Sequence, residues 1–166
     1  EIAEIRDPDQ LVATAAALIR ELFGYGLVTI FDADERNGRL TMRSCAPLPL
    51  EHEHFTLALP IEESSVVGRV AVTRQPIRVE DVRTSDVYLA TPETSSTRSE
   101  MAAPIIYAGQ LLGVLDVQSS RTSAFDEGDL TTLNTIADQI AVGLENGRLF
   151  TDEAKRRREL EVMLST

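Results

Sequence analysis

Residues 99–119 constrain the fold more than any other part of the sequence. Two apolar runs rich in β-branched residues, 101–106 and 111–117, are separated by the short segment Tyr107-Ala108-Gly109-Gln110. Two such runs around a short connection with glycine are typical of a β-hairpin. Because apolar residues occupy both alternating positions, we expect both strands in the centre of a sheet, covered on both faces. Pro104 cannot donate to a strand ladder, so we expect a bulge or an unpaired position there.

The rest of the chain supplies the other strands and the covering helices. Asp7-Pro8 and Asp126 are typical helix starts, and Ser64 or Ser65 can cap a shorter helix between them. The apolar spacing predicts helices over 8–23, from 64 or 65 to 74, and from 126 onward, and strands over 27–31, 39–45, 55–59 and 77–79. Strands and helices without regular alternation indicate the α+β class with an antiparallel sheet.

The hairpin also carries a family resemblance. SEMAAPI, a glycine turn, LLGVLDVQS, and then Ala124-Phe125 before an acidic helix start closely resemble the second half of GAF domains. GAF domains are small-molecule-binding and signalling modules of bacterial sensor proteins. The resemblance extends back through 67–71 and 75–82, although Arg74 stands where the family often has glycine. It implies a six-stranded antiparallel sheet with terminal helices on one face and short helices and loops over a ligand pocket on the other.

Composition excludes several classes of partner. The formal net charge of −11 argues against a nucleic-acid partner, because phosphate binding needs a cationic surface. No apolar run is long enough to cross a membrane and no signal-peptide pattern is present, so we expect a cytoplasmic location. We expect one GAF-like domain over 1–149, with 150–166 as the start of a C-terminal signalling helix in a longer protein.

Few residues suit catalysis or metal binding. His52 and His54 could share one face of a strand, but the sequence offers no third ligand, so we expect no metal site. Cys45 could be a redox sensor or a chromophore attachment point, but its place at a strand end favours an inert, partly buried thiol. A single cysteine also departs from GAF-type methionine sulfoxide reductases, which use more than one. With no nucleophile–base pair and no phosphate-binding glycine loop, the sequence predicts a protein that is not an enzyme.

The best candidate for a ligand pocket is the segment from Tyr88 into the first strand of the hairpin. It is rich in hydroxyls and includes an aromatic ring and a cation, and in GAF domains this region covers the ligand cavity. The alternative is a surface loop on a domain that binds nothing. The predicted ligand-binding residues are Tyr88, Arg98, Ser99, Glu100 and Asp116.

These observations predict a non-catalytic sensory domain of a multidomain signalling protein, such as a sensor histidine kinase, that binds a small molecule. Two alternatives are a ligand-free GAF domain that only dimerises and relays, and a catalytic GAF domain such as a free methionine sulfoxide reductase. The apolar stripe of the last helix ends near Leu149, yet no glycine or proline stops the helix before Thr166. We therefore expect a parallel homodimer through the terminal helices, with the signal passing to an output domain in the same chain.

Overall fold

The computed structural model of the chain describes residues 5–24, 26–47, 57–90 and 94–165. One six-stranded antiparallel sheet runs in the order β3-β2-β1-β6-β5-β4, which confirms the predicted α+β fold. The elements are α1 (Pro8–Phe23), β1 (Leu27–Asp34), β2 (Arg39–Ala46), β3 (Ala58–Pro60), α2 (Val66–Thr73), β4 (Ile77–Val79), a 3-10 turn η2 (Val82–Thr84), β5 (Ser99–Tyr107), β6 (Gln110–Ser119) and α3 (Glu127–Leu164).

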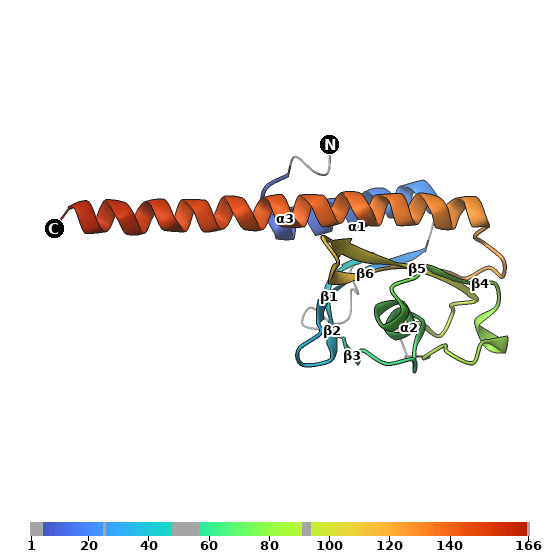
Figure 1. Ribbon diagram of the computed structural model, residues 1–166. Helices are drawn as coiled ribbons and strands as arrows, with labels where there is room; N and C mark the ends of the chain where they lie inside the picture. Colours follow the sequence, from blue (N-terminus) through green and yellow to red (C-terminus); the bar gives the residue numbers. More distant parts are fainter. Residues whose placement is uncertain (1–4, 25, 48–56, 91–93, 166) are drawn as a thin grey trace.

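The two faces of the sheet are covered differently. Helices α1 and α3 lie side by side on one face, and α2 lies on the other with the loops that flank it (Figure 1). We call these the helix face and the pocket face. The helix-face core joins residues of α1 and α3 to alternate residues of the central strands, among them Ile30, Met101, Leu115 and Leu133, all of which are buried. Each face therefore has its own apolar cluster, with the sheet between them.

The hairpin of β5 and β6 forms as the sequence predicts, in the interior of the sheet. Its turn residues Ala108 and Gly109 both have positive φ, 49° and 78°, as a two-residue type I′ turn requires. Pro104 pairs in register with Val114, and the irregularity falls one residue later, between Ile105 and Ile106. β4 begins at Ile77, opposite Ala102, so its pairing with β5 does not reach Pro104.

Side-chain caps set the helix starts. The Asp7 carboxylate accepts from the Asp9 amide, and Ser65 caps α2 through the Gly68 amide. Asp126 and Asp129 each accept from the other's amide at 2.8 Å, a capping box at the start of α3. Arg74, which ends α2, has a φ of 58°, the left-handed conformation that glycine adopts without strain.

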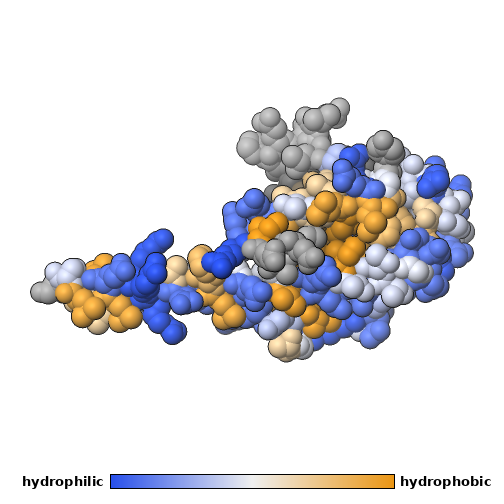
Figure 2. Space-filling view, turned by 90° about the horizontal axis from the view of Figure 1, so that it is seen from above, coloured by the Kyte–Doolittle hydropathy of each residue, from blue (hydrophilic) through white to orange (hydrophobic). Residues whose placement is uncertain are grey.

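Helix α3 is longer than the sheet it covers. Its C-terminal part projects away from the rest of the molecule (Figure 1), and its residues from 148 to 165 are exposed except for the half-buried Ala154. Seen from the helix layer, apolar surface continues along this projection between charged bands (Figure 2). The exposed apolar side chains of α3 are Val142, Leu149, Phe150, Leu160, Val162, Met163 and Leu164. None of the helices in the described ranges combines the length and apolarity that a membrane span needs.

Candidate functional site

Strand register brings five polar side chains together on the pocket face. Cys45 on β2 pairs with Thr29 on β1, and Thr29 pairs with Asp116 on β6. One row further along, Gln118 on β6 pairs with Glu100 on β5. Directly paired residues of a sheet point to the same face, and residues two apart on one strand do so as well. Glu100, Asp116 and Gln118 therefore share the pocket face.

The two carboxyl groups are withdrawn from water. Glu100 is 4% exposed and Asp116 is 1% exposed. Burial raises the pKa of Glu100 well above its ordinary range, and the negative charge of Asp116 and a hydrogen bond to it raise that pKa further. Burial also raises the pKa of Asp116, while hydrogen bonds from Glu100 and Gln118 partly offset this. Two carboxylates cannot both ionise cheaply so close together, so the pair retains a proton to higher pH than isolated acids do.

A chain of hydrogen bonds orients Asp116. Thr97 Oγ1 donates to Gln118 Oε1 at 2.8 Å, and Gln118 Nε2 donates to Asp116 Oδ2 at 2.8 Å. All three residues are buried. The other carboxylate oxygen, Asp116 Oδ1, is buried and receives no hydrogen bond within the described part of the chain. A buried acceptor without a donor is costly, so this oxygen is a place where a ligand's donor gains most.

A small cavity lies over these carboxyl groups. It has a volume of about 40 Å³, and its wall combines the acid pair with apolar side chains and two hydroxyls. A volume of this size holds roughly one water molecule, so a larger ligand requires side chains of the wall to move. The lining residues are Phe31, Leu57, Leu59, Ser65, Val66, Val67, Leu89, Thr94, Glu100, Asp116 and Gln118.

Cys45 lies on the same face, beyond Thr29. Its thiol accepts a hydrogen bond from Thr29 Oγ1 at 3.8 Å, and the residue is 8% exposed. Burial raises the pKa of the Cys45 thiol, and the negative charge of Asp116 adds to this effect. The thiol is therefore held in its protonated form near the acid pair.

The structure brings together only some of the predicted ligand-binding residues. Glu100 and Asp116 line the cavity, but Tyr88 and Arg98 are not among its lining residues. The Tyr88 hydroxyl donates to the Thr94 carbonyl, and Arg98 donates to the Thr97 carbonyl. Both belong to the loop that supplies Thr94 and Thr97, so their part in ligand binding stays a prediction.

Ser99 was also predicted to bind the ligand, but its side chain faces away from the cavity. Its hydroxyl donates to the Arg121 carbonyl at 2.6 Å and accepts from the Ala124 amide at 3.4 Å. Ser99 precedes Glu100 on a strand, so the two side chains point to opposite faces. Ser99 therefore fastens the segment before α3 rather than the pocket.

The sequence reasoning missed Gln118, Thr97, Thr94 and Ser65. Gln118 could have been found, because it lies two residues after Asp116 on a predicted strand and so shares its face. Thr97 and Thr94 lie in a loop that carries no periodic signal.

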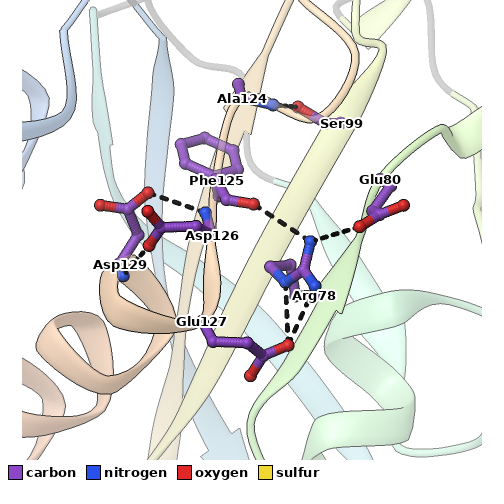
Figure 3. A network of polar contacts seen from close by, with 8 residues as sticks. All are labelled: Arg78, Glu80, Ser99, Ala124, Phe125, Asp126, Glu127 and Asp129. Carbon is purple, nitrogen blue, oxygen red and sulfur yellow. Dashed lines mark hydrogen bonds and ion pairs between the residues drawn. The ribbon is translucent and has the colours of Figure 1, made fainter.

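Arg78 forms a second polar network, at the start of α3 on the helix face. Its guanidinium binds the carboxylates of Glu80 and Glu127, both at 2.9 Å, and the Phe125 carbonyl at 3.2 Å (Figure 3). Every nitrogen of this guanidinium donates a hydrogen bond. The network joins β4 to the first turn of α3, next to the contact between Ser99 and Ala124, and leaves Arg78 occupied by protein groups.

The described ranges contain no group of three or more acidic, histidine or cysteine side chains arranged to hold a metal ion. His52 and His54 lie outside the described residues. A larger open groove of about 690 Å³ lies beside β4 and η2, but its lining carries three arginines and three acids and so has no net charge.

Solved structures similar to this chain include a reductase and the GAF domain of a phosphotransferase. The free methionine-R-sulfoxide reductase of Neisseria meningitidis, solved in complex with its substrate, is 27% identical, with a TM-score of 0.78 over 89% of this chain and 84% of that one. The GAF domain of an Acinetobacter phosphoenolpyruvate-protein phosphotransferase is 19% identical, with a TM-score of 0.77 over 92% and 90%.

The first of these corrects the prediction that the chain is not an enzyme, which is wrong as it stands. A reductase shares this fold at 27% identity, so the fold is compatible with catalysis. The prediction rested on absent nucleophile–base pairs and phosphate-binding loops, and those motifs do not test for thiol redox chemistry.

Comparison by sequence places the chain in a family. The Escherichia coli DNA-binding transcriptional activator HyfR is 26% identical over 154 residues, which is 88% of this chain. The chain spans 23% of the length of HyfR. The family model described as "GAF domain" matches residues 5–145, which includes the whole sheet and the start of α3. The chain therefore belongs to the GAF domain family.

Proposed function

We propose that the chain is a regulatory GAF domain that binds a small molecule carrying an ammonium group, such as an amino acid or a derivative of one. The acid pair of Glu100 and Asp116 receives the ammonium group, and the apolar wall of the cavity contacts the rest of the ligand. The observation that carries this proposal is the buried Asp116 Oδ1, which has no donor within the described ranges. A cation there gains a charge-assisted hydrogen bond shielded from water.

The comparison with the Neisseria reductase supports this class of ligand. That protein was solved with its substrate, and free methionine sulfoxide is an amino acid with an ammonium group. A buried carboxylate pair surrounded by apolar side chains is suited to such a group, because neither acid has a cationic side chain among the residues that line the cavity.

Calorimetric titration with L-methionine sulfoxide, and then with the common amino acids, tests the proposal. We expect saturable binding of at least one of them and a loss of affinity of at least about tenfold in Asp116→Asn, because the charge partner is removed. Glu63→Gln is the matched control, since it removes an exposed acid that does not line the cavity. Unchanged affinity in Asp116→Asn would place the ligand elsewhere.

The same comparison favours a second candidate, the reduction of free methionine sulfoxide. Cys45 is the chain's one cysteine, and it lies on the pocket face. Its sulfur would attack the sulfoxide sulfur, releasing methionine and leaving a sulfenic acid on Cys45. A dithiol in solution would then reduce the sulfenic acid, releasing water and forming its own disulfide. Turnover with dithiothreitol that is lost in Cys45→Ser would support this candidate; equal turnover in both proteins would exclude Cys45.

The regulatory part of the proposal rests on α3. Ligand binding on β5 and β6 would be relayed through α3 to an output domain in the same chain. In a bacterial signalling protein, a histidine kinase is an example of such a domain. The similarity to a transcriptional activator supports a regulatory setting. The exposed apolar side chains of the projecting part of α3 support a parallel homodimer, since a long exposed helix is marginal without a partner.

A further inference from the structure

The two acids of the pair differ in what surrounds them. Asp116 Oδ2 accepts from the Gln118 amide at 2.8 Å, and that amide is held in place by the Thr97 hydroxyl. The Gln118 amide has one donor end and one acceptor end, and a carboxylate requires the donor end. Thr97 donates to the acceptor end and the donor end faces Asp116, so the hydrogen bonds run from Thr97 through Gln118 to Asp116.

We propose that Gln118, held by Thr97, decides which acid carries the negative charge: Asp116 is the ionised member, and Glu100 keeps the shared proton. A neutral amide that donates to one carboxylate stabilises its charge and gives nothing to the other. Gln118 is in this sense a positioning residue, because it acts on the ligand through Asp116. The consequence for ligand binding rests on the proposed function.

This assignment narrows the ligand. The acid pair then carries one negative charge rather than two, because the proton on Glu100 is shared with Asp116. The site is therefore suited to a ligand with a single ammonium group, as a free amino acid has, and not to a dication.

The groups that face Asp116 are few. Glu100 faces it from β5, and the Cys45 thiol lies beyond Thr29 on β2. From α2 and its cap, Ser65, Val66 and Val67 line the cavity, and none of them titrates. The side chains of Glu100 and Cys45 are thus the titrating groups around Asp116 within the described residues.

Two isosteric variants give opposite outcomes under this proposal. Glu100→Gln retains an N–H donor in place of the protonated carboxyl, so we expect affinity for L-methionine sulfoxide, or for the amino acid that binds best, within about threefold of wild type. Asp116→Asn removes the charge, so we expect a loss of at least about tenfold. If the two variants weaken binding equally, both acids are ionised in the complex, and the inference is overturned while the proposed function stands.

A second measurement needs no ligand. Carbon-13 NMR of the labelled carboxyl groups follows the ionisation of each acid in the free protein as the pH rises. We expect Asp116 to ionise before Glu100 in wild type, and this order to be lost in Gln118→Leu. Glu100 ionising first in wild type would overturn the inference, whatever the ligand.

Thr97 provides the matched pair of controls. Thr97→Val keeps the shape but removes the hydroxyl that fixes the Gln118 amide, so we expect it to narrow the separation between the two ionisations. Thr97→Ser keeps the hydroxyl, so we expect the separation between the two ionisations to stay as in wild type. Equal narrowing in both variants would mean that packing, not the hydrogen bond, positions Gln118. If binding is unchanged in both acid variants, the proposed function fails, and the NMR order alone judges the inference.

Discussion

The two faces of the sheet use the same strands for different purposes. On β6, Leu115 and Val117 point to the helix face and are buried among apolar side chains, while the alternating residues Asp116 and Gln118 point to the pocket face. All four are at most 9% exposed. Burial alone therefore does not distinguish the two faces of β6. They differ in the chemistry of the buried side chains, which are apolar on the helix face and polar on the pocket face, where Asp116 Oδ1 has no hydrogen-bond donor within the described residues.

Alternate residues of β6 therefore serve different purposes: those on the helix face stabilise the fold, and those on the pocket face are suited to binding. Apolar side chains on the helix face gain free energy from leaving water. Buried carboxyl groups on the pocket face lose hydration that their neighbours only partly replace. A ligand or a proton can restore that loss, so the pocket face is where the molecule is expected to respond to its surroundings.

The largest expected effect is on the helix face. Leu115→Ala removes a side chain that is 0% exposed, and we expect a loss of about 2–5 kcal/mol in the free energy of unfolding, measured by denaturant titration. Leu112→Ala is the control on the same strand. Leu112 is only partly buried, so we expect a smaller loss there. Equal losses at both positions would contradict the comparison.

On the pocket face the expected effect depends on pH. The pKa of Glu100 is raised by folding, so the folded state holds a proton that the unfolded chain releases near its ordinary pKa of about 4.3. The stabilising contribution of this proton is complete below that pH and is lost as the pH rises through the folded-state pKa. Glu100→Gln lacks this titration. Denaturant midpoints measured from acid to neutral pH should therefore fall for wild type relative to the variant; parallel curves would contradict the prediction.

How much the sequence could predict follows the same division. The helix starts and the β5–β6 hairpin depend on local signals, namely caps, turn residues and apolar periodicity, and these gave the right elements. The strand run 101–106 is apolar at both alternating positions, so it gave no clue to which face Ser99 and Glu100 take. The register that brings Gln118 beside Glu100 is a tertiary property, and so is the reach of Thr97 from its loop to β6.

Ser99 tests whether polar contacts on the helix face matter. Ser99→Ala removes the bonds to the Arg121 carbonyl and the Ala124 amide, just before α3 begins. We expect a loss of about 1 kcal/mol, because both partners lose a bond in a partly buried place. Hydrogen exchange should show faster opening at the start of α3, while Ser120→Ala, an exposed neighbour, should change neither quantity. An unchanged exchange rate would mean that the Arg78 network and the capping box hold α3 without Ser99.

The smallest effect on stability is expected for the projecting part of α3, which belongs to neither face. Residues 150–164 would extend about 22 Å at 1.5 Å per residue, and their contact with the domain includes Arg6, whose guanidinium lies 4.7 Å from the centre of the Phe150 ring. Ending the chain at Leu149 should lower the free energy of unfolding by about 0.5–1 kcal/mol, the usual contribution of an exposed cation–π pair.

The effect of this truncation on association should be larger, because it removes Phe150, Leu160, Met163 and Leu164, all about half exposed or more. Sedimentation at micromolar concentration is expected to show a dimer for the intact chain and a monomer for the shortened one. Two monomers would remove the support for a relay through paired helices, and two dimers would move the contact to α1 and the start of α3.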